Sequence, residues 1–207
     1  MDHKIVEQAD QYFSTRLTQY GDSIMSLDWN SRSAQEIRFE QLTKVIRKTP
    51  DHFSICDYGC GLGDYNTYLS REFQSYDYHG YDVSESMINM AKSNHPGQYF
   101  TIGAQVENDF DYLVASGVFA LKLSIPDGEW EEYILETLNM FHKHTEKGFA
   151  FNCLTKYSDQ EHMKDCLYYA DPLMLFDYCK RNFSRNVALL HDYELYDFTI
   201  LVRKEAA

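Results

Sequence analysis

The chain has 207 residues, a length that suits one domain with a sizeable hydrophobic core. Its 32 acidic and 19 basic side chains give a formal net charge of −13, and no dense cluster of lysine and arginine stands out. Nucleic acid would be bound against electrostatic repulsion, which argues against it as a substrate or partner.

Residues 1–48 precede the first predicted strand and have the pattern of two helices, a cap or lid that we count as part of the same domain. Apolar side chains on one helical face predict the first helix: Ile5, Ala9, Tyr12, Phe13 and Leu17. A second helix is predicted after Ser33, which can cap it together with Glu36. It is expected to end at Thr49-Pro50.

Two side chains in this cap can bind a ligand. Trp29, between the two predicted helices, either packs them together or belongs to a lid over a pocket. Arg38, in the second helix, either lies on a solvated face or grips a carboxylate, for which a guanidinium is well suited. The sequence leaves both alternatives open for each residue.

Residues 53–69 form the clearest motif of the chain. A short apolar run typical of a buried strand closes with Asp57, and glycines follow at positions 59, 61 and 63. Apolar residues then recur at helical spacing. Glycine lets the backbone turn sharply and lets a ligand approach it, and the helix start offers free N–H groups. The stretch predicts a strand, a ligand-binding glycine turn and a helix.

Two acidic residues bear on the ligand. A dinucleotide site of the form G-x-G-x-x-G would need a third glycine where Asp64 stands, and a carboxylate there would repel pyrophosphate. A nicotinamide-dependent oxidoreductase is therefore disfavoured. Asp82 ends the next apolar segment, where a carboxylate can accept hydrogen bonds from both hydroxyls of a ribose.

The pattern Asp57-x-Gly59-x-Gly61-x-Gly63, with Asp82 after it, resembles motif I and the following acid of the class I S-adenosylmethionine-dependent methyltransferases. Residues 167–172 and 184–204 also look like small stand-alone bacterial members. The resemblance covers residues 50–203. It implies an α/β, Rossmann-like sheet of seven strands in residues 49–207, mostly parallel with a C-terminal antiparallel hairpin and with helices on both faces.

The resemblance also implies S-adenosylmethionine as the cofactor and further contacts to it. Val83 would pack on the adenine, and Ala104 and Gln105 would lie at its rim, where the family often has an acid. Ser116 would lie beneath the methyl group. Trp29 would cover the methionyl part, and Arg38 would pair with its carboxylate.

The second half of the chain alternates further strands and helices. Strands are predicted at 111–116, 149–153, 187–190 and 196–202, and helices at 130–144 and 173–181. The second of the terminal strands alternates, with Tyr196, Phe198, Ile200 and Val202 on one face. Residues 154–172 form an insertion-like segment. A substrate pocket is expected at Gly117, Tyr157, Tyr168 and Tyr169, because segments after strand ends build such pockets in open α/β sheets.

The function that follows from the resemblance is methyl transfer to a small molecule by in-line displacement, most often to oxygen. A carboxylate, phosphonate or thiolate needs no general base, whereas an alcohol or phenol does. His191, beside Asp192, is the first candidate and His162 the second, with a surface or structural role as the alternative for each. A second hypothesis is a non-catalytic cofactor-binding or partner subunit, which would lack an open pocket beside Ser116.

The remaining composition bounds the cellular setting. The five cysteines form no C-x-x-C pair and no zinc-finger spacing with histidine, which predicts a reducing compartment and no metal site. The N-terminus has no apolar leader, and no run approaches a membrane span. We expect a cytoplasmic monomer or homodimer that binds neither membrane nor nucleic acid.

Overall fold

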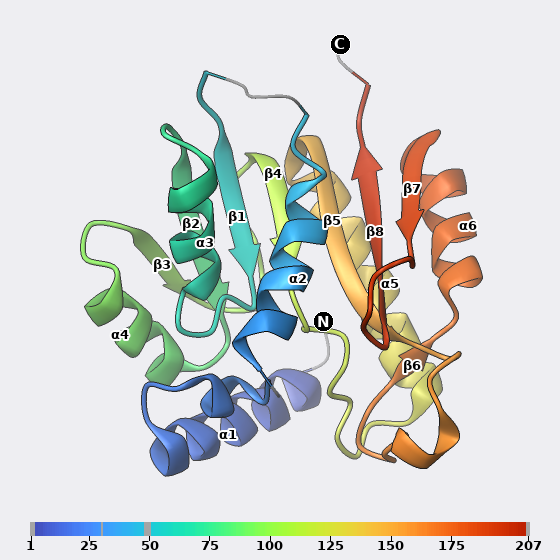
Figure 1. Cartoon of the computed structure of the whole chain (residues 1–207), viewed down its shortest axis with the longest axis horizontal. Helices are drawn as coiled ribbons and strands as arrows, with labels where there is room; N and C mark the ends of the chain where they lie inside the picture. The colour runs from blue at the N-terminus through green and yellow to red at the C-terminus, as the bar shows by residue number, and fades with distance from the viewer. Residues whose placement is uncertain (1–2, 30, 48–50, 206–207) are drawn as a thin grey trace.

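The computed structural model describes residues 3–29, 31–47 and 51–205. In this part of the chain, one sheet contains all eight strands (Figure 1). They are β1 (Ser54–Tyr58), β2 (Asp77–Asp82), β3 (Tyr99–Ile102), β4 (Phe110–Ala115), β5 (Thr145–Thr155), β6 (Tyr169–Ala170), β7 (Asn186–Leu190) and β8 (Asp197–Arg203).

The strand order is β3-β2-β1-β4-β5-β8-β7, and the short β6 pairs with β5 off this path. All neighbours are parallel except that β8 runs antiparallel to both β5 and β7. The order reverses between β1 and β4, and a ligand in an open α/β sheet binds outside the carboxyl ends of the strands at such a point. The predicted, mostly parallel sheet with its antiparallel hairpin is confirmed.

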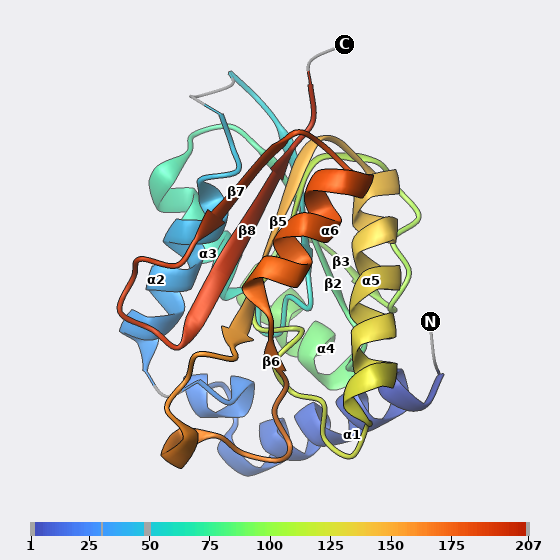
Figure 2. The ribbon, with the colours of Figure 1, turned by 90° about the vertical axis from the view of Figure 1, so that its right-hand side faces the viewer.

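Helices cover both faces of the sheet. The described helices are α1 (His3–Tyr20), η1 (Ile24–Leu27), α2 (Arg32–Thr43), α3 (Asp64–Glu72), α4 (Glu85–Asn94), α5 (Asp127–Lys143), η2 (Gln160–His162) and α6 (Pro172–Asn182). Side chains of α2, α3 and α4 enter one buried cluster, and those of α5 and α6 enter another. In Figure 2, α2 and α3 lie on one side of the sheet and α5 and α6 on the other.

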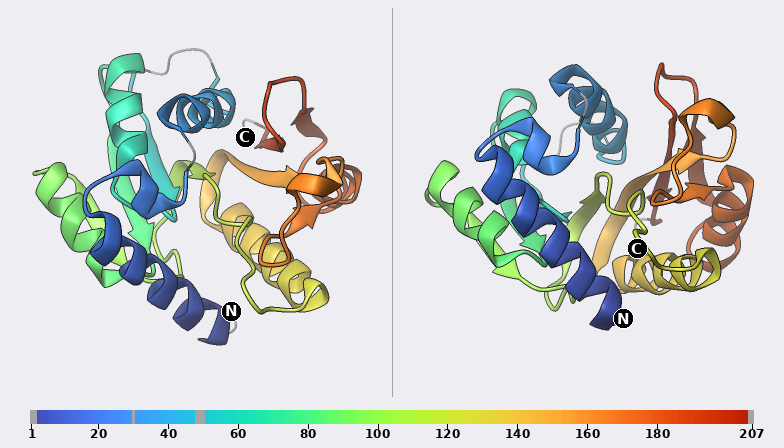
Figure 3. Two further views of the ribbon diagram at one scale, coloured as in Figure 1. Left: turned by 60° about the horizontal axis from the view of Figure 1, so that its bottom comes forward. Right: turned by 90° about the horizontal axis from the view of Figure 1, so that it is seen from below.

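The first helix lies across the functional edge of the sheet. Figure 3 shows α1 running beneath the carboxyl ends of the parallel strands, beside η1 and α4. Ile5 and Leu17 anchor it, since both are buried on the face that the sequence predicted. The N-terminal helices thereby cover the loops that follow the carboxyl ends of the parallel strands.

Two predicted details are wrong. Helix α2 begins at Arg32, because Ser31, not Ser33, is the cap and accepts a hydrogen bond from the Ala34 N–H. Strand β8 is buried on both faces instead of alternating, because it lies inside the sheet between β5 and β7. The expected helix end at Thr49-Pro50 and the boundary at residues 48–49 fall outside the described residues.

No described helix combines the length and the apolar character that crossing a bilayer requires.

Candidate active site

The glycine turn between β1 and α3 adopts a backbone that only glycine tolerates easily. Gly59, Gly61 and Gly63 have φ angles of +72°, +54° and +82°. The N–H groups of Gly59 and Cys60 both donate to the Tyr81 carbonyl, at 2.7 and 3.0 Å. These bonds tie the turn to the end of β2, so the two loops form one rigid rim.

Asp82 stands on that rim at the last position of β2. One carboxylate oxygen accepts the Gly61 N–H at 2.9 Å, and the other accepts the Ser84 N–H at 2.9 Å. Burial raises the pKa of Asp82, and the bonds from these amides oppose the rise. A carboxylate can accept more than two hydrogen bonds, so Asp82 is fixed in place with capacity left for a ligand hydroxyl.

Asp57, near the end of β1, is almost completely buried. The Tyr78 hydroxyl donates to it at 2.7 Å. Burial raises the pKa of Asp57 to about 7; the bond from Tyr78 lowers it, and the nearby carboxylates of Asp82 and Asp64 raise it further. Asp57 therefore titrates near neutral pH, and a cation beside it would hold it ionised.

A first pocket opens over the turn, with about 1040 Å³ of space including its mouth. Of the residues predicted to bind a cofactor, it is lined by Trp29, Asp57, Gly59, Gly61, Asp82, Val83 and Ser116. Four others lie outside its lining: Gly63, Ala104, Gln105 and Arg38. Gly63 instead forms the cap of α3, and the Ala104 carbonyl accepts a bond from Tyr58.

A second, larger pocket adjoins the first and holds about 1980 Å³ including its mouth. The two share Phe13, Leu27, Trp29, Gly117 and Leu121. The second pocket extends from Gly117 toward the β7–β8 loop and the segment before β6, which contribute Tyr193 to Asp197 and Cys166 to Leu167.

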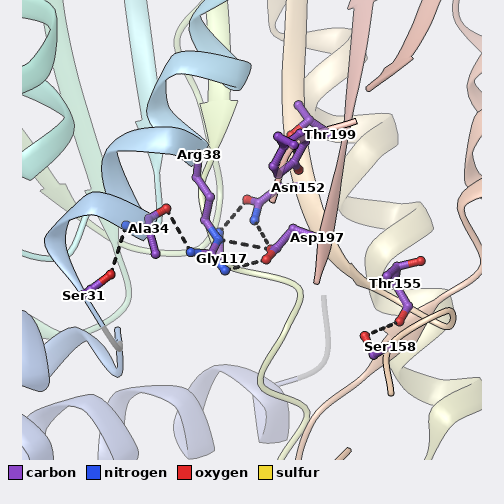
Figure 4. A network of polar contacts seen from close by, with 10 residues as sticks. Ser31, Ala34, Arg38, Gly117, Asn152, Thr155, Ser158, Asp197 and Thr199 are labelled. Carbon is purple, nitrogen blue, oxygen red and sulfur yellow. Dashed lines mark hydrogen bonds and ion pairs between the residues drawn. The ribbon is translucent and has the colours of Figure 1, made fainter. Parts of the chain in front are cut away.

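Arg38 belongs to a buried network beside the second pocket (Figure 4). It donates through Nε to Asp197 at 3.2 Å and through Nη2 to the other oxygen of the same carboxylate. Asn152 donates to Asp197 at 2.8 Å and accepts the Gly117 N–H at 2.8 Å. The structure thus differs from the predicted role of Arg38, because its guanidinium already holds a protein carboxylate.

The two candidate catalytic histidines are not among the residues that line either pocket, although His162 contacts the ring of Tyr196, which lines the second. His191 is exposed and packs against the rings of Tyr157 and Phe198. His162 is exposed beside Glu161 and the ring of Tyr196. No histidine is among the described residues that line either pocket. A histidine base therefore stays a prediction, since neither side chain lines a pocket in the described structure.

The three predicted pocket tyrosines also lie outside both linings. Tyr157 is exposed, and Tyr168 is buried, with its hydroxyl donating to Glu131. The Tyr169 hydroxyl accepts the Lys164 N–H. The reason is that residues 169–170 pair with β5, which directs this segment toward the sheet. Other tyrosines line the pockets: Tyr58, Tyr65, Tyr81 and Tyr133 the first, Tyr12, Tyr193 and Tyr196 the second.

Sequence reasoning missed Gln35, whose side-chain amide donates to Asp64 at 3.0 Å in the first pocket. It connects helix α2 to the start of α3, and no local pattern announces such a contact. Cys60 and Tyr58 also line the pocket and stand between the motif residues. Their positions between Asp57, Gly59 and Gly61 in the motif could have identified them as pocket residues.

The first pocket fits S-adenosylmethionine and not a dinucleotide. Among the described residues, its lining contains the carboxylates of Asp57, Asp64 and Asp82 and no basic side chain, which favours a cation and repels pyrophosphate. The Ser116 hydroxyl oxygen is buried there without a hydrogen-bond partner in the described structure, so it awaits one from a ligand. The described residues contain no cluster of three or more side chains that could hold a metal ion.

Comparisons with known proteins agree with this site. A family model described as a methyltransferase domain matches residues 55–146. The Mycobacterium tuberculosis protein named "Putative methyltransferase Rv1506c" is 50% identical over 162 residues, which are 77% of this chain and 98% of that protein.

Solved structures share the fold. Magnesium protoporphyrin IX methyltransferase from Synechocystis PCC 6803, with bound S-adenosylmethionine, superposes with a TM-score of 0.69 at 16% identity and covers 99% of this chain and 98% of its own. The plantazolicin methyltransferase BpumL, with S-adenosylhomocysteine, gives 0.60 at 14% identity and 98% of each chain. The glycine turn, the acid-lined pocket and these matches together establish that the chain belongs to the class I S-adenosylmethionine-dependent methyltransferases.

Proposed function

We propose that this enzyme methylates an oxygen atom of a small molecule that binds in the second pocket. The observation that carries this proposal is that the two pockets share Gly117, directly after Ser116, whose hydroxyl has no hydrogen-bond partner among the described residues. A non-catalytic subunit would not need a second pocket at this point. The net charge of −13 supports small molecules over nucleic acid as substrates, and the cysteine pattern supports a reducing compartment such as the cytoplasm. A monomer or homodimer is part of the same proposal.

Different residues of the chain would bind the cofactor and exclude water from the reaction. Asp82 would accept hydrogen bonds from the ribose, while Asp57 and Asp64 would supply negative charge to a cationic ligand. When bound, S-adenosylmethionine supplies an electrophilic methyl group on a positively charged sulfur. In-line displacement would join the acceptor oxygen to that methyl carbon as the carbon–sulfur bond breaks, with the electron pair left on sulfur. Apolar walls such as Val83 and Leu121 exclude water from this exchange.

The acceptor oxygen is one that is ionised before it binds. No histidine lines either pocket in the described structure, and the Tyr12 hydroxyl has a pKa raised to about 12 by burial and by its bond to Asp28. The basic side chains that line the second pocket, Arg16, Arg38 and Lys164, are balanced by Asp28, Glu194 and Asp197. An ionised acceptor is therefore inferred from the lack of a base in the described lining. A carboxylate meets these conditions, since it needs no proton removed and alignment alone supplies much of the rate.

The experiment is an acceptor screen with S-adenosylmethionine, in which S-adenosylhomocysteine and the methylated product are measured by liquid chromatography and mass spectrometry. The panel contains matched carboxylates, phenols, alcohols and amines. Product esters are the expected result. Turnover of amines alone would overturn oxygen as the acceptor atom, and turnover of alcohols alone would overturn the absence of a base.

The histidine variants His191→Gln and His162→Gln are expected to keep kcat within about twofold of the wild type, because both rings lie outside the pockets. A catalytic base would cost about 100-fold or more. The measurement is kcat and its pH profile with the best acceptor of the screen. A large loss in either variant, with unchanged cofactor affinity, would restore that histidine as the base.

Asp82→Asn is expected to weaken the binding of S-adenosylhomocysteine by about 1–3 kcal/mol, because the substituted side chain presents one acceptor oxygen in place of two. Isothermal titration calorimetry measures the change. Asp77→Asn is the matched control, since Asp77 begins the same strand but is exposed at its opposite end. Equal affinities in both variants would contradict the assigned role of Asp82.

A further inference from the structure

The short segment from Ile24 to Trp29 places two side chains against two glycines of the site. An ideal Cβ added to Gly61 would lie 2.5 Å from Leu27 Cδ2, and one added to Gly117 would lie 2.6 Å from Trp29 Cη2. Leu27 and Trp29 therefore fill the space that each glycine leaves free. The segment thus contacts both the glycine turn, through Leu27, and the loop after β4, through Trp29.

Arg38 holds Trp29 in this position from the face of the indole ring. The Arg38 guanidinium lies over the indole, 4.4 Å from the ring centroid, a cation–π contact. Arg38 is itself fixed by Asp197, and Asn152 joins Asp197 to the Gly117 N–H. The same network thus holds both sides of the contact, the indole and the loop that it touches.

The position of the indole matters because Trp29 and Gly117 line both pockets. The ring stands where the first pocket meets the second. Asp28, directly before it, has a φ of +62°, a left-handed backbone that costs free energy for a residue other than glycine. Asp28 ends η1 in this conformation, so the chain changes direction directly before the indole.

We propose that Trp29 is a movable partition between the two pockets, latched by Arg38, and that an aromatic ring of the acceptor replaces the indole beside Gly117. The inference rests on the proposed function for the identity of the second pocket. While closed, the indole excludes water from the methyl donor. Once it leaves, the face of the Arg38 guanidinium that the indole covered can receive an aromatic ring of the acceptor, while the N–H groups of Arg38 stay bonded to Asp197 and the Ala34 carbonyl. The acceptor class is an aromatic carboxylate.

Acrylamide quenching of Trp29 tests the latch. The variant Trp130→Phe leaves Trp29 as the single tryptophan, since the chain has two. Adding Arg38→Met and Asp197→Asn, which removes both buried charges together, should raise the quenching constant about fivefold, as for the loss of a contact worth about 1 kcal/mol. Arg71→Met is the control, because it removes an exposed cation over Tyr68. Unchanged quenching in the first variant would overturn the latch.

Release of S-adenosylhomocysteine tests the partition. Trp29→Phe and Trp29→Ala each keep Trp130, which lines the first pocket and reports binding by stopped-flow fluorescence. Dissociation should be about tenfold faster with alanine than with phenylalanine. Ser31→Ala in the phenylalanine background removes the cap of α2 without touching the indole, and it should leave the rate unchanged. Equal rates for alanine and phenylalanine would overturn the partition.

Paired ligands test the acceptor class. Benzoate should bind the S-adenosylhomocysteine complex of Trp29→Ala about fivefold more tightly than cyclohexanecarboxylate, and the preference should vanish with Arg38→Met and Asp197→Asn. Equal affinities would overturn the aromatic class but leave the partition standing. If the acceptor screen fails to yield esters, the proposed reaction fails, while the quenching and release experiments still decide the role of Trp29.

Discussion

Replacing Asp197 by alanine is expected to lower the free energy of unfolding by about 3–5 kcal/mol. Asp197 is 2% exposed and receives hydrogen bonds from Arg38 Nε, Arg38 Nη2 and Asn152. Without the carboxylate, the Arg38 guanidinium remains buried with no counter-charge, and the Asn152 amide loses its acceptor. Urea denaturation near neutral pH, followed by circular dichroism, measures the loss.

Two variants make the result specific. Arg38→Met with Asp197→Leu removes both charges and should cost clearly less than Asp197→Ala alone, because apolar side chains of similar volume can replace a buried pair. Glu36→Ala breaks an exposed ion pair of the same helix with Arg71 and should cost at most about 1 kcal/mol. A loss below 1 kcal/mol for Asp197→Ala would mean that water enters the cavity and solvates Arg38.

The network also marks the limit of what the sequence predicted. Arg38 and Asp197 are 159 positions apart, so no local pattern links them. The sequence identified Arg38 as an arginine suited to a carboxylate, which is correct chemistry with a different partner. Which carboxylate it meets depends on where β8 lies in the sheet, and strand order is a property of the whole fold.

The glycine turn was predictable for the opposite reason. Its determinants are local: positive φ angles demand glycine, and the acids at the ends of β1 and β2 are placed by adjacent parallel strands. His191 follows β7, which runs in the same direction as β5 because β8 is antiparallel to both, and its loop does reach the second pocket through Tyr193 to Tyr196. Which side chains of that loop line the pocket is not written in a local pattern. Periodicity likewise could not reveal that β8 has a strand on each side.

Asp57→Asn is expected to stabilise the ligand-free protein above pH 7. Burial raises the pKa of Asp57 from its ordinary value near 3.8 to about 7. Between these pH values the folded protein binds more protons than the unfolded chain, so the free energy of unfolding falls as pH rises through the window. Asparagine removes the charge and can still accept the Tyr78 hydrogen bond. The gain at pH 8 should be roughly 2–4 kcal/mol and should vanish near pH 4.

The same substitution should weaken the binding of S-adenosylmethionine about tenfold or more, because a cationic ligand favours the ionised carboxylate. In the wild type, affinity should rise with pH through about 7, and this dependence should disappear in Asp57→Asn. Thermal unfolding and calorimetric titration at pH 5, 7 and 8.5 measure both effects. A variant that is less stable than the wild type at pH 8.5 would show that the charge supports the fold. If Asp57→Asn is more stable and binds S-adenosylmethionine more weakly, the buried charge of Asp57 destabilises the fold and stabilises the bound cofactor.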